Sequence, residues 1–230
     1  RALEVDLETA LREDQLEVWY QPIQSLGSGQ LRGYEALVRW RHPTRGLIPP
    51  DLFVPIAEQN GSIDRLGEIV LEKACREAAR WDRRVSVAVN LSPQQFRRPE
   101  PLVQAVRRAL AASGLEASRL YLEVTESFLI EDTPQTRAAF NNLAASGVKF
   151  SLDDFGAGYS GLSRFAETQT DLVKIDMNLI RGVEASRARR AIVKGLAVMT
   201  RDLGVELLAE GVETHAEYEA LREAGIRLFQ

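Results

Sequence analysis

Eight short runs of strand-forming residues alternate with amphipathic segments along this chain, and this alternation constrains the fold more than any other feature. Several runs are almost continuously apolar, which is typical of strands buried on both faces of a parallel sheet. Eight such strands alternating with helices in 230 residues predict an α/β protein with a (β/α)8 TIM-like barrel. The runs are Glu17–Ile23, Leu31–Val38, Val85–Leu91, Leu120–Thr125, Val148–Leu152, Leu172–Ile175, Val205–Ala209 and Ile226–Phe229.

Between most of these runs, apolar residues recur at the spacing of a helix. Local signals mark where these helices begin and end. Thr133 precedes a first-turn proline, and Thr214 with Glu217 fits a capping box. Glycines follow four of the segments, as expected at helix C-termini. The predicted helices are Leu3–Arg12, which enters the barrel, and Ile63–Trp81, Leu102–Ala112, Thr133–Ser146, Arg187–Leu203 and Thr214–Ala224.

The first two runs break the pattern of a regular barrel. They are joined only by the glycine-rich segment Ser25–Gly29. A connection of this length forms a hairpin and is too short for a parallel crossover. We therefore expect an irregular barrel whose first strand runs antiparallel to the others.

Composition removes several classes of function. The single cysteine, Cys75, excludes an intrachain disulfide and a cysteine-based zinc site, and the two histidines, His42 and His215, exclude a multi-histidine metal site. A net charge of −4 argues against a nucleic-acid coat or a basic membrane-surface protein. No apolar stretch reaches membrane-spanning length and no signal peptide is visible, so we expect a cytoplasmic domain without direct membrane or nucleic-acid contact.

Acidic, amide and amine side chains stand at or just beyond the ends of most predicted strands. In barrel enzymes the C-terminal ends of the strands hold the active site, so these side chains should converge there. Lys174 lies between two apolar strand residues and needs a charged partner, which an acidic cluster would supply. The residues are Glu35, Asn90, Glu123, Glu126, Asp153, Asp154, Lys174, Asp176, Glu210, Glu213 and Gln230.

Carboxylates gathered at one place repel one another and raise each other's pKa unless a cation neutralises them. The available ligands are carboxylate and amide oxygens without cysteine or histidine, which favours a hard ion, Mg²⁺ or Mn²⁺. Five carboxylates, Glu35, Glu123, Asp153, Asp154 and Glu210, exceed what one Mg²⁺ usually takes from a protein. Two ions are therefore plausible, an arrangement that recurs in phosphate-ester displacement.

The sequence around these positions resembles the EAL domains, the bacterial cyclic di-GMP phosphodiesterases. The resemblance covers essentially the whole chain, and its blocks occur in the family's order, which makes the match specific. One block differs in detail, because Gly161 follows Tyr159-Ser160 where the family often has a second serine. The blocks are Tyr20–Ile23, the Glu35–Trp40 run EALVRW, Val89–Ser92, Glu123–Glu126, Asp153–Ser160, Val173–Asp176 and Ala209–Glu213.

The resemblance also implies a role for each residue in the hydrolysis of cyclic di-GMP to linear pGpG. Glu35, Asn90, Glu123 and Asp153 would hold one metal ion, and Asp153, Asp154 and Glu210 the other. Lys174 would orient the attacking water, and Glu210 would help as a base. Arg39 would grip a phosphate oxygen. By the same resemblance Gln21, Leu37, Glu213 and Gln230 would line the substrate groove, Glu126 would tether the loop Asp154–Ser160, and Asp176 would support the site from behind.

Other interpretations remain open for single residues and for the whole chain. Taken alone, Asp153-Asp154 is better explained as a turn, and Trp19, Trp40 and Trp81 are better explained as packing residues. A catalytically silent cyclic di-GMP receptor or scaffold is the alternative function; such domains typically lack several metal or loop residues, and this chain has them. An enolising Mg²⁺ barrel enzyme would also use strand-end carboxylates and a lysine.

The ends of the chain lead to further expectations. The sequence begins with Arg1, so we expect residues 1–230 to be one domain cut from a longer multidomain protein. The resemblance implies an upstream sensory or diguanylate-cyclase-like domain and a homodimer. It also implies that a last barrel helix, which the family usually has, is missing after Gln230.

Overall fold

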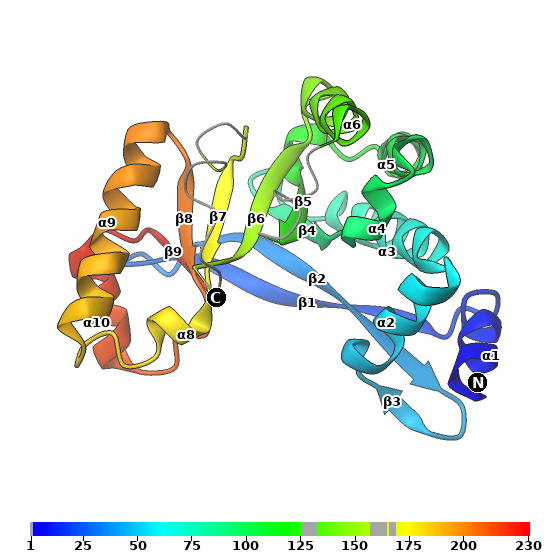
Figure 1. The fold of residues 1–230 in the computed structure, drawn as a ribbon, viewed down its shortest axis with the longest axis horizontal. Coiled ribbons are helices and arrows are strands. Elements are labelled where there is room, and N and C mark those ends of the chain that lie inside the picture. Colours follow the sequence, from blue (N-terminus) through cyan, green and yellow to red (C-terminus); the bar gives the residue numbers. More distant parts are fainter. Residues whose placement is uncertain (1, 126–132, 157–164, 166–168) are drawn as a thin grey trace.

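The computed structural model describes residues 2–125, 133–156, 165 and 169–230. In this part of the chain eight strands close into a barrel, and Figure 1 shows helices packed around it. The barrel strands are β1 (Leu16–Ser25), β2 (Leu31–His42), β4 (Ser86–Asn90), β5 (Leu120–Thr125), β6 (Lys149–Phe155), β7 (Leu172–Ile175), β8 (Glu206–Ala209) and β9 (Leu228–Phe229). Each overlaps one of the predicted runs, so the sequence-based prediction of a barrel is confirmed.

The barrel closes through β1, which is antiparallel to both of its neighbours. It pairs with β2 along the ribbon that crosses Figure 1, and with β9 through Gln24 and Phe229. The strands from β2 through β9 otherwise pair in parallel around the barrel. Residues 26–30 form the predicted hairpin connection, with Gly27 and Gly29 in the left-handed region, which explains why a glycine-rich turn stands here.

The helices lie where the sequence predicts them, with small shifts at their ends. Thr214 and Glu217 form the predicted capping box, and Gly114, Gly204 and Gly225 end their helices with positive φ. The predicted helices appear as α1 (Ala2–Ala10), α3 (Ile63–Ala78), α5 (Pro99–Ser113), α6 (Pro134–Ala145), α9 (Arg187–Leu203) and α10 (His215–Ala224).

Several short elements in the strand connections were not predicted. Between β2 and α3 the chain adds β3 (Gly46–Ile48), which extends β2 as a hairpin, and α2 (Pro50–Asn60). The other additions are α4 (Pro93–Phe96), a 3₁₀ turn at Ala117–Arg119, and α8 (Met177–Ile180).

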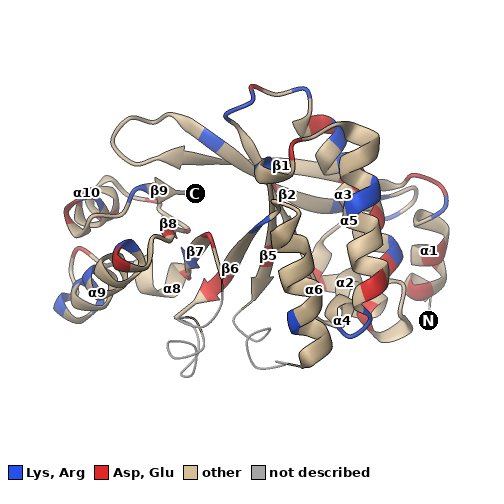
Figure 2. Cartoon of the chain, turned by 90° about the horizontal axis from the view of Figure 1, so that it is seen from above, with Lys and Arg blue, Asp and Glu red and all other residues tan. Residues whose placement is uncertain are grey.

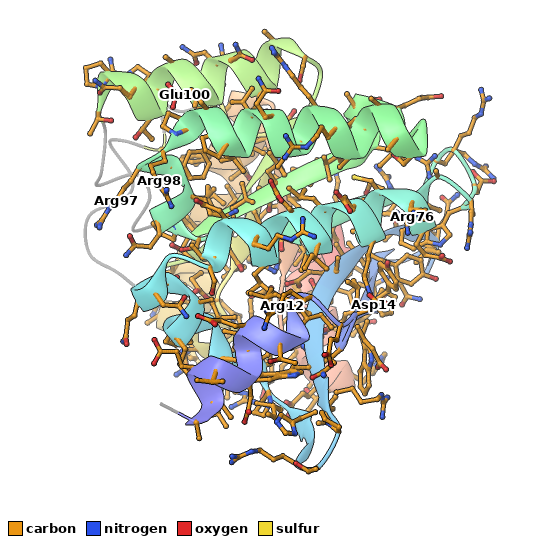
Figure 3. The ribbon with its side chains drawn as sticks, turned by 90° about the vertical axis from the view of Figure 1, so that its right-hand side faces the viewer. Arg12, Asp14, Arg76, Arg97, Arg98 and Glu100 are labelled. Carbon is orange, nitrogen blue, oxygen red and sulfur yellow. The ribbon has the colours of Figure 1, made fainter. Side chains whose placement is uncertain are left out.

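A single large apolar cluster fills the space between the sheet and the helices. Figure 3 looks onto the outer helices, where Arg12 and Arg76 are labelled; both side chains are exposed. Within the cluster Trp40 and Phe53 are fully buried in edge-to-face contact, and Phe150 stacks on Phe140 of α6. Aromatic contacts and large buried areas of this kind stabilise the barrel against its helical layer.

The inside of the barrel has its own, smaller apolar layer. It consists of Ile23, Ala88, Tyr121, Leu172, Leu208 and Leu228, which come from six different strands. Side chains along a strand alternate between its two faces, so the inward-facing residues on either side of this layer lie at opposite ends of the barrel. The apolar layer therefore separates two polar ends of the barrel.

Candidate active site

Lys174 stands at the centre of the C-terminal end of the barrel, in contact with carboxylates from four other strands or strand ends. Its Nζ lies 2.7 Å from Glu210 Oε1 and 3.1 Å from Glu35 Oε2. It lies 3.4 Å from both Glu123 Oε1 and Asp153 Oδ1. The lysine side chain is only 1% exposed, so its charge is balanced by these carboxylates rather than by water. The sequence-based expectation of an acidic partner for Lys174 is confirmed.

Glu35 is held from three sides. Asn90 Nδ2 donates to Glu35 Oε1 at 2.7 Å, Gln230 Nε2 donates to Oε2 at 2.6 Å, and Lys174 donates to the same Oε2. These residues come from β2, β4, β7 and the end of β9, so the barrel has to close before the set can form. Burial alone would raise the pKa of Glu35, but Lys174 and the two amides hold that pKa below its usual value.

Three other carboxyls of the cluster, Glu123, Asp154 and Glu210, have raised pKa values. Burial raises the pKa of Glu123 well above its usual range, and neighbouring carboxylates add to the rise while Lys174 opposes it. The same balance raises the pKa of Glu210 to about 7, and burial beside Asp153 raises the pKa of Asp154. Burial would lower the pKa of Lys174, yet the surrounding carboxylates hold it well above its usual value. One ammonium thus does not neutralise the cluster.

Asp153, Asp154 and Glu210 form a group of oxygen ligands. One carboxylate oxygen from each lies within 4.8 Å of the others. Asp154 adopts the left-handed conformation, with φ of 57°, which an aspartate tolerates better than most residues. Figure 2 shows acidic residues in red at the arrowhead of β6, the strand that carries Asp153 and Asp154. Both residues lie within β6, at an irregularity in its pairing with β7, so the alternative explanation of this pair as a simple turn is wrong.

Buried oxygen atoms without hydrogen-bond donors fit a cation at this end of the barrel. Glu123 Oε1 and Gln230 Oε1 are both buried, and neither accepts a hydrogen bond within the described part of the chain. Glu123 Oε1 has the Lys174 ammonium 3.4 Å away but no hydrogen bond. Leaving buried acceptors without hydrogen bonds costs free energy that a coordinated cation would recover. Five carboxylates against one ammonium leave a formal excess of four negative charges, which two divalent cations would balance.

The register of β1 and β2 places the predicted groove residues. Gln21 lies opposite Glu35, Trp19 opposite Leu37, and Glu17 opposite Arg39. Directly opposite residues share a face of the sheet, so Gln21, Leu37 and Arg39 lie on the same face as Glu35. Leu37 and Arg39 follow Glu35 along β2, away from the end of β1 that pairs with β9.

Trp19 is a residue of this surface that the sequence analysis assigned to packing. Its side chain is 46% exposed, and the guanidinium of Arg39 lies over the ring at 5.5 Å from its centre. Its indole nitrogen donates to Glu17, which also pairs with Arg41. Trp19 and Gln21 are two residues apart in a strand, so their side chains lie on the same face. An assignment of Gln21 to the groove therefore also predicts Trp19 there.

The remaining predicted residues lie in varied surroundings. Asp176 is buried and caps α8 through the backbone amide of Asn178 at 2.9 Å. Glu213 is exposed and pairs with Arg181 at 3.2 Å. Glu126 and residues 157–160 of the predicted loop fall outside the described residues. No finding assigns a catalytic or binding role to any single predicted residue, so those roles stay predictions.

Comparison with known proteins gives a consistent result along the chain. A family model described as the EAL domain matches residues 4–230. Cyclic di-GMP phosphodiesterase NbdA of Pseudomonas aeruginosa is 42% identical over 232 residues, which cover 99% of this chain and 30% of that protein. The bifunctional diguanylate cyclase/cyclic di-GMP phosphodiesterase MucR of the same organism is 41% identical over 229 residues, covering 98% and 33%. The chain thus spans about a third of the length of these curated relatives.

Solved structures agree with these sequence comparisons. The PaMucR phosphodiesterase in complex with c-di-GMP matches with a TM-score of 0.92 and 40% identity, over 100% of this chain and 94% of that one. Klebsiella pneumoniae BlrP1, in a calcium/cy-diGMP complex, matches with a TM-score of 0.82 and 34% identity. That match covers 94% of this chain and 54% of BlrP1.

Proposed function

This chain belongs to the EAL domain family, and from that premise we propose that it is a metal-dependent phosphodiesterase that hydrolyses cyclic di-GMP to linear pGpG. The observation that carries the proposal is the convergence of Glu35, Glu123, Asp153 and Glu210 on buried Lys174. Such a site has a large excess of negative charge and a fixed internal cation. It suits the binding of divalent cations and, through them, of a phosphodiester.

The residues present fit two Mg²⁺ or Mn²⁺ ions. Glu35, Asn90, Glu123 and Asp153 would hold one ion, and Asp153, Asp154 and Glu210 the other, with Asp153 shared. All these ligands offer oxygen, which these hard ions prefer. Asn90 uses its NH₂ group to bond Glu35, and this leaves its carbonyl oxygen for a ligand. When bound, such ions polarise the phosphodiester and lower the pKa of a water.

Lys174 and Glu210 carry the proton and charge steps of the proposed reaction. Lys174 Nζ donates toward the reacting phosphate and its attacking water, and its raised pKa keeps it charged at any physiological pH. Glu210 Oε1, 2.7 Å from that nitrogen, takes the proton that the water loses. A carboxylate within hydrogen-bond reach of the water is suited to accept a proton in this way.

In this proposal the surface formed by β1 and β2 positions the substrate. Arg39 presents a planar, permanently charged fork suited to a phosphate oxygen, and Trp19 supports it from beneath. Gln21, Leu37, Glu213 and Gln230 complete the groove in this proposal. Glu126 would tether the loop Asp154–Ser160, and Asp176 would support the residues that hold the metal ions. We expect the whole protein to act as a homodimer that carries an upstream sensory or cyclase-like domain. In the described residues no helix has the length and apolar character that crossing a bilayer requires.

Chromatography of cyclic di-GMP incubated with the protein tests the proposal. We expect pGpG to appear with Mg²⁺ or Mn²⁺ and to be absent with EDTA. If cyclic di-GMP binds in the presence of metal but survives, the domain is a receptor in spite of its complete set of ligands. If cyclic di-GMP neither binds nor reacts, the proposed substrate is wrong, and other metal-dependent barrel chemistries become the better explanation.

A further inference from the structure

A second cavity opens at the opposite end of the barrel from Lys174. It has a volume of about 270 Å³ and is lined by residues at the start of several strands, among them Arg32, Ser86, Tyr121 and Lys149. The apolar residues Ile23, Ala88, Leu172 and Leu228 also line it, and they belong to the layer inside the barrel. That layer forms the floor of the cavity and separates it from the acidic cluster.

The charge of this cavity is opposite to that of the active site. Its cationic lining residues are Arg32, Arg83, Arg84, Arg119 and Lys149, whereas its carboxylates are Glu116 and Glu206. The chain as a whole carries a net charge of −4, so this local excess of positive charge is not an average property of the surface. A concave surface with one sign of charge concentrates counter-ions of the other sign.

Arg119 supplies a fixed positive charge in the wall of the cavity. Its side chain is buried, and its guanidinium donates to the backbone carbonyls of Val85 at 3.0 Å, Ala78 at 2.7 Å and Asp82 at 3.2 Å. These three partners are neutral oxygens. They accept from Nε and Nη2 without cancelling the charge, which a guanidinium cannot lose in a protein.

The more exposed arginines have only weak ion pairs. Arg32 lies 3.4 Å from Glu206, and Arg83 lies 3.9 Å from Glu116, with both arginine side chains about half exposed or more. Exposed pairs of this kind are worth little free energy, so an incoming anion can replace the carboxylate at small cost. Arg84 differs, because it holds Asp82 with two hydrogen bonds.

Lys149 and Tyr121 form the inner side of the site. Lys149 Nζ lies 3.2 Å from the Tyr121 hydroxyl and 5.2 Å from the centre of its ring. The partner of this ammonium is a neutral phenol, which leaves its remaining donors for a ligand. The Tyr121 ring also offers an apolar face next to the floor of the cavity.

We propose that this cavity is a binding site for a small phosphate-bearing anion, which Arg32, Arg83 and Lys149 hold by its phosphate. The volume lies just below the range usual for small-molecule pockets, so it suits inorganic phosphate or a phosphate monoester with a few carbon atoms. Arginine and lysine around one phosphate give strong charge-assisted hydrogen bonds. In a monoester the carbon part rests on Leu172, Leu228 and the Tyr121 ring.

Calorimetric titration of residues 1–230 tests the site, with inorganic phosphate and glycerol 3-phosphate as probes. EDTA is present throughout, which removes metal-assisted phosphate binding at the acidic end. We expect saturable binding of at least one probe. In the variant Arg32→Gln/Lys149→Met the affinity falls at least about tenfold, as expected when two charged hydrogen-bond donors are lost. Tighter binding of glycerol 3-phosphate identifies a monoester site, and equal binding of both probes identifies a site for the phosphate group alone.

Arg12→Gln serves as the matched control, because it removes a positive charge from the exposed turn that follows α1 (Figure 3). Its affinity for the probes should stay within twofold of the wild type. The proposal is overturned if neither probe saturates, if Arg12→Gln weakens binding as much as the double variant, or if the double variant binds like the wild type. Far-UV circular dichroism checks that the double variant is folded, and Arg83→Gln, whose side chain is highly exposed, gives an independent variant if it is not.

Discussion

Lys174 Nζ lies 2.7 Å from Glu210 Oε1, and this contact joins the lysine that supplies positive charge in the proposed reaction to the carboxyl that accepts a proton. Both groups have raised pKa values, for opposite reasons. Burial dominates at Glu210, whereas the surrounding carboxylates outweigh burial at Lys174. The pair therefore combines a permanent cation with a carboxyl that titrates near neutral pH.

Replacing Lys174 by methionine should abolish most of the turnover. The substitution keeps the length of the side chain and removes the charge that stabilises the phosphate in the transition state. Loss of one such group typically costs about 10²-fold or more in rate. Turnover of cyclic di-GMP with saturating Mn²⁺ measures the effect, and Lys194→Met, on the exposed side of α9, is the control. Turnover by Lys174→Met within threefold of the wild type would contradict the role given to this lysine.

The stability of the metal-free protein should fall as the pH rises from about 5 to 8. The pKa of Glu210 is raised from 4.5 to about 7 in the folded state. A carboxyl with a raised folded-state pKa contributes stability that is fully present below its unfolded value and is lost as the pH rises through about 7. The loss amounts to roughly 3 kcal/mol at 1.36 kcal/mol per pKa unit.

Thermal unfolding in EDTA, followed by circular dichroism, measures this dependence. Lys174 does not contribute to it, because its pKa is raised above 10.5 and the group stays protonated across the range. Glu210→Gln should make the profile less steep between pH 5 and 8, while Glu123 and Asp154, whose pKa values are also raised, keep part of the slope. A profile for Glu210→Gln as steep as that of the wild type would show that another group is responsible.

Glu123→Gln should change stability and metal binding in opposite directions. Glu123 is almost fully buried among other carboxylates, and its pKa is raised well above the usual range. The neutral amide relieves repulsion, so Tm in EDTA should rise at pH 8. It also removes a charged ligand, so Mn²⁺ affinity should fall at least about tenfold.

A control for this variant is Glu100→Gln, on the exposed first turn of α5 and labelled in Figure 3. It should leave both quantities close to those of the wild type. A fall of Tm in Glu123→Gln together with unchanged Mn²⁺ affinity would show that Glu123 is a structural residue of the barrel interior.

Cys75 should resist thiol reagents as long as the protein is folded. It is fully buried on α3, and burial raises the pKa of its thiol to about 12. The reactive thiolate is therefore scarce at pH 8. Titration with Ellman's reagent should give almost no reaction in buffer and one equivalent in 6 M guanidinium chloride. One equivalent within minutes in buffer would show that α3 opens readily from the barrel.

The strands and the main helices could be predicted from local patterns, because burial on both faces leaves a run such as Leu120–Thr125 almost continuously apolar. The strand and helix between residues 43 and 60 could not be predicted in this way. Pro49, Pro50 and Pro55 all act locally as breakers, yet Pro50 lies in the first turn of α2 and Pro55 is accommodated inside it. β3 has only three residues, Gly46–Ile48, too few to show a period.

The candidate site could likewise be predicted only in part from the sequence. An acidic partner for Lys174 could be predicted, because a lysine between Val173 and Ile175 cannot remain buried alone. The bonds that fix Glu35, from Asn90 and Gln230, depend on the closure of the barrel. The place of Arg39 over Trp19 depends on the register of β1 and β2. Neither relationship has a local sequence signal.

The most direct test of the account is the number of Mn²⁺ ions that the acidic cluster binds. Titration followed by the electron paramagnetic resonance signal of free Mn²⁺ gives this number without any substrate. We expect two ions per chain at pH 8. We also expect Asp153→Asn to weaken the binding of both, because Asp153 is the ligand they share. A stoichiometry of zero or one, or two ions that bind Asp153→Asn as tightly as the wild type, would contradict the proposed two-metal site.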